Sequence, residues 1–244
     1  MNNLVHRREF EHTLANYKIS PKALAIISDM KLVLLAGPSG VGRNTIITQL
    51  LQLGDYNYIV SDTTREPRIN NGQREKNGVT YWFRSEEDFL SDLRNGQFLE
   101  AEIIHNQQVS GISLRELKKA YRSGCIAIDE VEIGGFNNIM RIKPDALGIF
   151  VFPPNFNEWL KRLLNRGQMT RENLINRLKT SLIIYQCAME REQANIIIND
   201  HLTTAVSLIN DLAHNRPVNQ NYSKLRQLTE QLYKQTSDYL LNKA

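Results

Sequence analysis

The stretch Gly-Pro-Ser-Gly-Val-Gly-Arg-Asn-Thr at residues 37–45 constrains the fold of this 244-residue chain more than any other feature. It follows an apolar run at residues 31–36, which has the length of a buried parallel strand. It precedes residues 46–51, whose apolar side chains are spaced like the buried face of a helix. A strand, a glycine-rich turn and a helix together indicate a phosphate-binding loop, because glycines let backbone N–H groups approach phosphates at a helix N-terminus.

This loop departs from the usual pattern, G-x-x-x-x-G-K-[ST], at two positions. Arg43 stands in place of the lysine, and Asn44 stands in place of the hydroxyl residue. Arginine keeps the positive charge in a larger planar group, and the side chain of Asn44 offers a carbonyl oxygen to Mg²⁺. We therefore expect nucleotide binding with slower phosphoryl transfer than the usual loop would give. A chance glycine-rich turn is the alternative interpretation.

The charge, the cysteines and the apolar runs of the sequence limit the partners and the compartment that we expect for this protein. Lysine and arginine exceed aspartate and glutamate by 30 to 26, and this formal charge of +4 suits anionic substrates at least as well as nucleic acid. Cys125 and Cys187 lie far apart without metal or redox spacing, so reduced thiols are expected. No apolar run approaches 18 residues, and residues 1–10 lack the apolar segment of a signal peptide. We expect a soluble, cytoplasmic protein that binds neither nucleic acid nor a membrane.

Residues 61–68, Ser-Asp-Thr-Thr-Arg-Glu-Pro-Arg, place two arginines on an extended or turning segment, because Pro67 disfavours a helix. Paired arginines on a loop suit a phosphate monoester, since each guanidinium can donate two parallel hydrogen bonds. Residues 78–83 follow with the alternation of a strand and the pattern Gly-x-x-Tyr-x-Phe. Together with the glycine loop, these motifs resemble those of guanylate kinases, and the similarity runs from about residue 31 to about residue 215.

The resemblance implies transfer of the γ-phosphoryl group of ATP to GMP, giving ADP and GDP with the help of Mg²⁺. The residues that it implies for ATP are those of the loop and one asparagine near the adenine: Gly37, Pro38, Ser39, Gly40, Val41, Gly42, Arg43, Asn44, Thr45 and Asn199. The residues that it implies for the GMP phosphate are Ser61, Arg65, Arg68 and Tyr81.

The guanine base is assigned to a carboxylate. Phe98-Leu99-Glu100 resembles the family segment whose glutamate reads guanine. Guanine presents N1–H and N2–H donors side by side, and a carboxylate accepts from both. Adenine has an acceptor at N1 and would leave the carboxylate unpaired, which is costly in a desolvated pocket.

Two segments depart from the family pattern. The family tyrosine near the base corresponds to Ser110, and the neighbouring hydroxyl position falls at Ile112 or Ser113, so we expect weaker or rearranged base recognition. Glu130 and Glu132 follow the apolar strand at residues 126–128 in place of two family aspartates. Their i, i+2 spacing at a strand end predicts that both carboxylates lie on one side. Glu132 is assigned to guanine and Glu130 to the metal side with Asn44; Asp129 competes with Glu130 for that role.

Arginines after the buried strand at residues 147–152 resemble those of the family's lid. Arg162 and Arg166 lie four residues apart on an expected helix, and Arg177 lies on the next helix. In the family such arginines close over the transferring phosphoryl group, where they stabilise its developing charge. The implied catalytic residues are Arg43, Arg162, Arg166 and Arg177.

The sequence therefore predicts an α/β protein of the P-loop NTPase fold, with a parallel sheet flanked by helices. The guanylate kinase-like domain spans residues 31–215, with a small GMP-binding lobe at about 61–115 and a helical lid at about 155–193. Residues 1–30 suggest one or two short helices that form a packing extension, an oligomer contact or an arm. Residues 216–244 form a helical extension, for which docking on the core and homodimerisation are both open.

Two classes of function fit these features. The first is the kinase, which the glycine loop and the lid arginines favour. The alternative is a catalytically impaired guanylate-kinase-like module that binds nucleotide or an acidic or phosphorylated partner, which Arg43 and Asn44 favour. Nucleic-acid binding ranks third, because the charge is low and aromatic and basic residues do not interleave.

Overall fold

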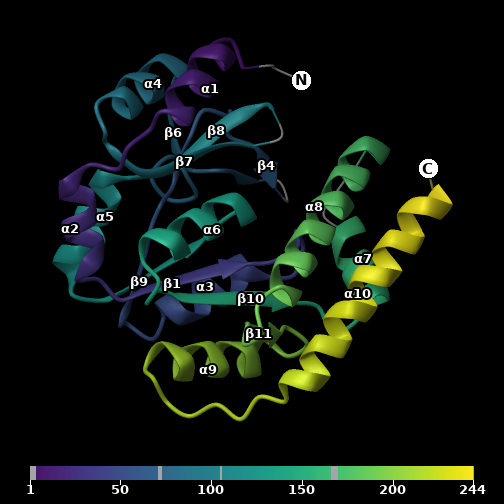
Figure 1. Cartoon of the computed structure of the whole chain (residues 1–244). Coiled ribbons are helices and arrows are strands. Elements are labelled where there is room, and N and C mark those ends of the chain that lie inside the picture. The colour runs from purple at the N-terminus through teal and green to yellow at the C-terminus, as the bar shows by residue number, and fades with distance from the viewer. Residues whose placement is uncertain (1–3, 71–72, 105, 166–169, 244) are drawn as a thin grey trace. The chain divides into compact units, whose positions relative to one another are not determined.

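The computed structural model describes residues 4–70, 73–104, 106–165 and 170–243 of the chain (Figure 1). The chain divides into two compact units, each assembled from separate stretches of sequence. The first unit consists of Met1–Leu32, Asp55–Asp129 and Asn137–Ala146. The second unit consists of Val33–Gly54, Glu130–Phe136 and Leu147–Ala244.

A parallel sheet with the strand order β11-β10-β1-β9-β2 forms the centre of the fold. β1 (Leu32–Ala36) pairs in parallel with β10 (Leu147–Phe152), and β10 pairs in parallel with β11 (Asn195–Ile198). In the first unit, β2 (Tyr56–Tyr58) pairs in parallel with β9 (Ile126–Glu130). β1 is buried along its whole length, as expected for a parallel strand covered on both faces. The predicted α/β fold class is confirmed.

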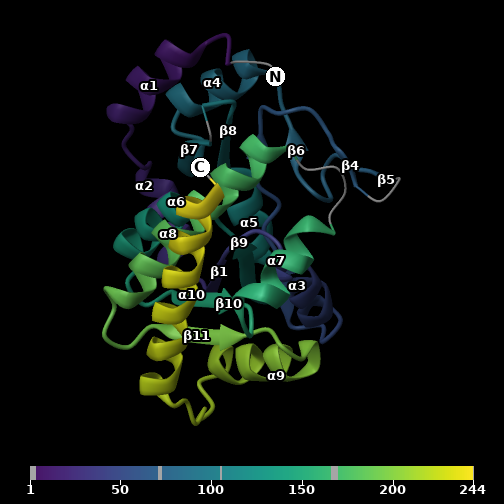
Figure 2. The same cartoon turned by 90° about the vertical axis from the view of Figure 1, so that its right-hand side faces the viewer.

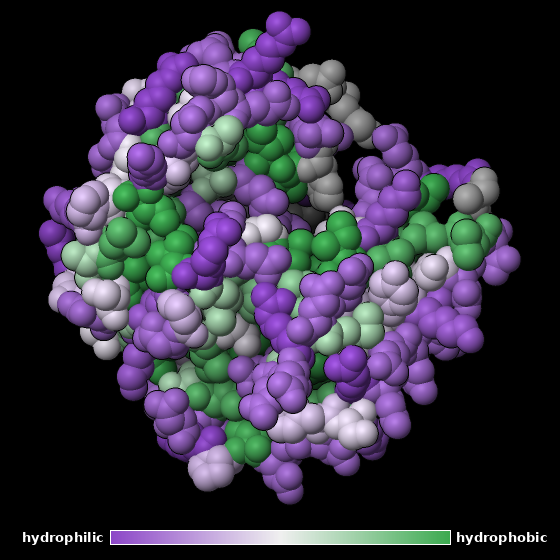
Figure 3. Space-filling model, in the orientation of Figure 1, coloured by the Kyte–Doolittle hydropathy of each residue, from purple (hydrophilic) through white to green (hydrophobic). Residues whose placement is uncertain are grey.

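Helices of the second unit surround its strands. They are α3 (Arg43–Leu51), α7 (Phe156–Leu164), α8 (Arg171–Met189), α9 (Leu202–Ala213) and α10 (Tyr222–Lys243). α9 packs on α3, and α10 runs alongside α8 and also contacts α7 (Figures 1 and 2). Polar residues are interspersed with apolar ones over α10 in Figure 3. Leu232, in the middle of α10, is fully buried, so the C-terminal extension docks on helices of its own chain.

The N-terminal extension is part of the core of the first unit. It forms α1 (Arg7–Ala15) and α2 (Pro21–Ser28), and α1 packs on α4 (Glu86–Arg94) and β7 (Phe98–Ile104). Phe10 is fully buried with its ring centroid 6.0 Å from that of Phe89, which stacks on Phe98 at 4.4 Å. Of the three roles open for residues 1–30, the structure therefore shows a packing extension.

A second sheet of the first unit has the order β6-β3-β8-β7. Its further strands are β6 (Trp82–Phe83), β3 (Asp62–Thr63) and β8 (Gln108–Ser113), and β8 is antiparallel to both β3 and β7. A small hairpin joins β4 (Ile69–Asn70) to β5 (Gln73–Arg74). The remaining helices are α5 (Leu114–Ser123) and α6 (Ile133–Ile142). Cross-strand partners share a face, so Thr63, Ser110 and Glu102 lie on one side of this sheet.

One predicted strand is shorter than the sequence indicated. The strand predicted over residues 78–83 contains only Trp82 and Phe83. Gly78 has a φ of 73°, and the N–H groups of Val79 and Thr80 donate to the carbonyl of Lys76, so residues 76–80 form a turn.

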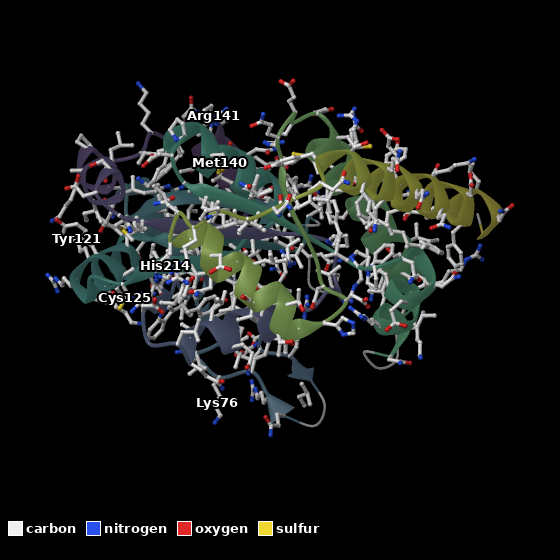
Figure 4. The ribbon with its side chains drawn as sticks, turned by 90° about the horizontal axis from the view of Figure 1, so that it is seen from below. Lys76, Tyr121, Cys125, Met140, Arg141 and His214 are labelled. Carbon is white, nitrogen blue, oxygen red and sulfur yellow. The ribbon has the colours of Figure 1, made fainter. Side chains whose placement is uncertain are left out.

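Neither cysteine is in a disulfide in the described structure, which agrees with the prediction of reduced thiols. Cys125 lies between α5 and β9 (Figure 4), and Cys187 is buried in α8. Among the described residues, no helix has the length and apolar character needed to cross a membrane.

Candidate active site

The phosphate loop, residues 37–42, turns from β1 into α3. Gly42 caps the start of α3 with a φ of 94°, and a Cβ there would lie 2.5 Å from Nδ2 of Asn199. A Cβ on Gly37 would lie 2.3 Å from the carbonyl oxygen of Val151. Both positions therefore require glycine. The N–H groups at the start of α3 have no partners within the helix, which makes this end suited to an anion.

Three side chains of the second unit hold the phosphate loop in place. Trp159 of α7 donates from Nε1 to the carbonyl of Ser39 at 2.8 Å, and Arg177 of α8 donates to Ser39 Oγ at 3.2 Å. Asn199, predicted near the adenine, is buried and donates from Nδ2 to the carbonyl of Val41 at 2.7 Å. These bonds shape the loop before a ligand arrives, which lowers the entropic cost of binding.

Arg43, in place of the usual lysine, makes contacts at the ends of two strands. Its Nη1 donates to the carbonyl oxygens of Val131 at 3.2 Å and Leu35 at 3.4 Å. Its Nε lies 3.6 Å from Oε2 of Glu130, and both side chains are largely buried. The guanidinium therefore has protein partners in the free protein, and Glu130 orients it.

The residues predicted on the metal side offer oxygen donors. Asn44 and Thr45 are exposed in the first turn of α3, and Glu130 is held by Arg43. Mg²⁺ in kinases is held by one or two such groups together with phosphate oxygens and water. Among the described residues, no group of three histidine, cysteine or acidic side chains could hold a metal ion. These donors fit a metal that arrives with a nucleotide.

The structure describes two of the three predicted lid arginines, Arg162 and Arg177. Arg162 of α7 donates from Nη1 to the carbonyl of Asn199 at 2.8 Å, at the exit of β11. α7, as the structure describes it, ends at Leu164, and the prediction that one helix carries both Arg162 and Arg166 stays a prediction. Arg166 itself lies outside the described residues. Arg177 lies on the next helix, as predicted, and contacts the phosphate loop.

In the first unit, the arginines of residues 61–68 meet one carboxylate. Arg65 contacts Glu75 with both terminal nitrogens, at 2.5 Å from Nη1 to Oε2 and 2.9 Å from Nη2 to Oε1. The backbone N–H of Arg68 donates to the same carboxylate at 2.8 Å. The guanidinium carbon of Arg65 lies 4.7 Å from the centre of the Tyr81 ring. The structure thus brings Arg65, Arg68 and Tyr81 together, and we call this group with Glu75 the arginine fork.

Glu75 is a site residue that the sequence did not reveal. The β4–β5 hairpin returns the chain so that the N–H of Glu75 donates to the carbonyl of Arg68 at 2.9 Å; the next residue, Lys76, is labelled in Figure 4. Burial opposes ionisation of Glu75, but hydrogen bonds from Arg65 and Arg68 outweigh it and lower the pKa. Burial and the charge of Arg65 lower the pKa of Arg68. The sequence did not reveal the register of this hairpin.

The acidic residues around the end of β9 have different partners. Ser61 donates from Oγ to Oδ2 of the fully buried Asp129 at 3.2 Å, whereas Glu130 contacts Arg43. β9 ends at Glu130, and the partly exposed Glu132 lies beyond it. Strand alternation therefore does not place Glu130 and Glu132 on one side, contrary to the prediction.

Glu100 lies on the face of the second sheet that also carries Glu102. Glu100 pairs with the fully buried Ile112, and Glu102 pairs with Ser110. Ser110 donates from Oγ to Thr63 Oγ1 at 2.8 Å. Burial, and secondarily the charge of Glu102, raises the pKa of Glu100 to about 8. The structure thus offers a partly buried carboxyl with a short serine hydroxyl on the same face.

The sequence of the chain is similar to those of known proteins. Residues 29–216 match the family model described as Guanylate kinase. The guanylate kinase of Trichormus variabilis is 38% identical over 184 residues, which cover 75% of this chain and 88% of that protein. The guanylate kinase of Malacoplasma penetrans is 34% identical over 191 residues, which cover 76% of this chain and 93% of that protein.

A solved structure shares the fold. The crystal structure of guanylate kinase from Anaplasma phagocytophilum matches with a TM-score of 0.60 and 23% identity, covering 77% of this chain and 86% of that one. The family match includes the phosphate loop, the arginine fork and the lid helices, and it ends before α10 begins. The chain therefore belongs to the guanylate kinase family.

Proposed function

We propose that the chain transfers the γ-phosphoryl group of ATP to GMP and releases ADP and GDP. The observation that carries this proposal is the presence in one chain of two shaped anion sites, the phosphate loop and the arginine fork. A helix N-terminus with a glycine loop fits a nucleoside triphosphate, and paired guanidinium groups fit a phosphate monoester.

ATP binds through the backbone N–H groups of the phosphate loop and the start of α3. Arg177 already contacts Ser39, so its guanidinium lies beside the loop that holds the phosphates. Arg162 and Arg166 complete the lid in this proposal. The transition state spreads charge over the phosphoryl oxygens, and converging guanidinium groups stabilise that charge. The protein contributes position and electrostatics, because phosphoryl transfer needs little covalent chemistry from side chains.

The phosphate of GMP binds at the arginine fork. Glu75 fixes the guanidinium of Arg65 and the backbone of Arg68, so neither has to be ordered when GMP arrives. Tyr81 and Ser61 complete this group of phosphate ligands.

The guanine base binds beside Glu100. Its N1–H and N2–H donors meet the ionised carboxylate, and adenine cannot supply this pair of donors. Ser110 and Glu132 are the further base contacts that we propose. Because Ser110 is short and already bonds to Thr63, Glu100 supplies most of the discrimination.

Mg²⁺ accompanies ATP, and when bound it neutralises charge on the β- and γ-phosphates. Asn44 at the start of α3 and the carboxylate of Glu130 are the protein oxygens that we propose for the metal side. Arg43 contacts Glu130 and carries a positive charge at the start of α3.

A coupled assay of ADP formation with ATP, Mg²⁺ and each of GMP, AMP, CMP and UMP tests the proposal. We expect GMP to be used with by far the highest kcat/KM. Arg65→Lys keeps the charge but loses the two-pronged contact, and should raise the KM for GMP by roughly tenfold or more. The exposed Arg74 of β5 is the matched control, and Arg74→Lys should have no effect. Similar rates with all four monophosphates would overturn the assignment.

A binding module without catalysis is the second candidate, because Arg43 contacts Glu130 and two backbone carbonyls in the free protein. Such a module would bind GMP in calorimetry without forming ADP in the coupled assay. Binding with turnover excludes it, and binding without turnover establishes it.

A further inference from the structure

The C-terminal helix α10 lies beyond the residues matched by the family model, yet it contacts both helices that hold the phosphate loop. The match ends at residue 216, and α10 spans Tyr222–Lys243. α10 packs along α8, which carries Arg177, and against α7, which carries Trp159. Figures 1 and 2 both show α10 running alongside α8.

The beginning of α10 is attached to the strand end of the second unit. Just before the helix, Gln220 donates from Nε2 to the carbonyl of Ile196 in β11 at 3.2 Å. Arg226 donates to the carbonyl of Met189, the last residue of α8, at 3.3 Å. Further along, Leu232 is fully buried. The beginning of α10 is therefore attached to β11 and α8, and its middle is buried.

The end of α10 reaches α7 through an aromatic contact. The ring centroid of Tyr239 lies 5.6 Å from that of Phe156, the first residue of α7. The ring centroid of Phe156 in turn lies 5.9 Å from that of Trp159, which is one turn further along the same helix face. Trp159 is fully buried, and its ring centroid lies 6.2 Å from that of Tyr185 in α8. A continuous row of rings thus leads from α10 to the indole that donates to the carbonyl of Ser39.

We propose that Tyr239 is a positioning residue for the phosphate loop, acting through Phe156 and Trp159. α7 contains nine residues, so a contact at its first residue controls where Trp159 lies one turn later. The Trp159–Ser39 bond then sets the shape of the loop that receives ATP. This inference rests on the proposed function only in naming ATP as the ligand.

Kinetics of the full-length chain provide the first test. Tyr239→Ala should raise the KM for ATP by about threefold to tenfold, the range expected for loss of an aromatic pair. The KM for GMP should stay unchanged, since the arginine fork belongs to the other unit. Tyr239→Phe keeps the ring and should behave like the unaltered chain. Tyr222→Ala removes a 46% exposed tyrosine from the same helix and should change neither KM.

Trp159 fluorescence provides a readout that needs no turnover. The chain has two tryptophans, and Trp82→Phe leaves Trp159 as the sole tryptophan while keeping a ring under Arg115. In this background, Tyr239→Ala should shift the emission to longer wavelength as water reaches the indole, and calorimetry should show weaker ATP binding. If the alanine variant does not fold, Tyr239→Leu keeps apolar bulk without the ring and should give the same shift.

The proposal is overturned if Tyr239→Ala, or Tyr239→Leu in its place, leaves Trp159 emission and ATP affinity equal to those of Tyr239→Phe. It is also overturned if ATP and GMP affinities fall together, since this would indicate a general loss of structure. A chain without kinase activity would contradict the proposed function but would leave the fluorescence result readable.

Discussion

The pKa of Glu100 is about 8 because burial disfavours the charged carboxyl and Glu102 adds a negative charge nearby. Guanine donors bind the ionised form, so we expect GMP affinity to rise as pH increases from 7 towards 8.5. Below the pKa, each pH unit changes the ionised fraction by roughly tenfold. A phosphate monoester titrates near pH 6, about one unit below this window. Calorimetry with GMP at several pH values measures the effect.

Two glutamine substitutions are the controls for this prediction. Glu102→Gln removes the second cause of the raised pKa and should move the rise in affinity to lower pH. Glu100→Gln should weaken GMP binding and make it independent of pH in this range. A GMP affinity that stays constant from pH 7 to 8.5 in the unaltered chain would show that Glu100 does not read the base in its ionised form.

The same raised pKa makes stability depend on pH. The Glu100 carboxyl titrates near 4.5 in the unfolded chain and near 8 in the folded one. Between these values the folded state binds the extra proton, so this group lowers the free energy of unfolding as pH rises through the window. The difference in free energy of unfolding between Glu100→Gln and the unaltered chain should therefore shift in favour of Glu100→Gln as pH rises from 5 to 8.5. Urea unfolding at both pH values measures it, and an equal difference at both would contradict the raised pKa.

Arg43 and Asn44 bear on the rate of transfer. Arg43 is directed at two carbonyls and Glu130, whereas a lysine would present a compact charge that fits between phosphate oxygens. Asn44 offers Mg²⁺ a carbonyl in place of a hydroxyl. Arg43→Lys with Asn44→Ser should raise the single-turnover rate by about tenfold or more, which corresponds to about 1.4 kcal/mol in the barrier. If the unaltered chain is already fast and the double change slows it, Arg43 and Asn44 form an adapted pair.

At the scale of elements, the phosphate loop depends on the close approach between the cap of α3 and the residue that follows β11. Gly42→Ala would force a left-handed alanine and bring its Cβ within 2.5 Å of Asn199 Nδ2. Strain of this kind amounts to about 1–3 kcal/mol. We therefore expect ATP affinity to fall roughly tenfold while GMP affinity is retained, as measured by calorimetry with each nucleotide. The control is Gly54→Ala, which also has a positive φ but no neighbour within 4 Å.

Elements with a long apolar run or a clear helical pattern could be predicted from the sequence. The strand β10 has the predicted bounds, and β1 begins one residue later than predicted. Residues 78–83 alternate in sequence, but Gly78 and the hydrogen bonds to Lys76 turn the chain before Trp82. The alternation of side chains therefore predicted a strand that was too long, because a positive φ and a turn determine the backbone before Trp82.

Some site residues could be predicted from the sequence, and others could not. Arg65, Arg68 and Tyr81 were predicted together, and the structure brings them together around Glu75. Glu75 was missed because its role depends on the register of a hairpin, and Trp159 was missed because an indole on an amphipathic helix looks like core. Such partners depend on tertiary contacts, which a single sequence does not encode locally.

In the whole molecule, the phosphate loop belongs to the second unit and the arginine fork belongs to the first. Neither site alone distinguishes a kinase from a nucleotide-binding module. We propose that a phosphoryl group passes from the nucleotide on the loop to the nucleotide at the fork.

The most direct measurement is a rapid-quench, single-turnover experiment with γ-labelled ATP, Mg²⁺ and GMP on the full-length chain. We predict that the label appears in the β-phosphate of GDP at the same rate as ADP forms, and that AMP, CMP and UMP acquire little label. ADP formation with the label released as inorganic phosphate, or GMP binding with no transfer of label, would contradict the assignment as an ATP:GMP phosphotransferase.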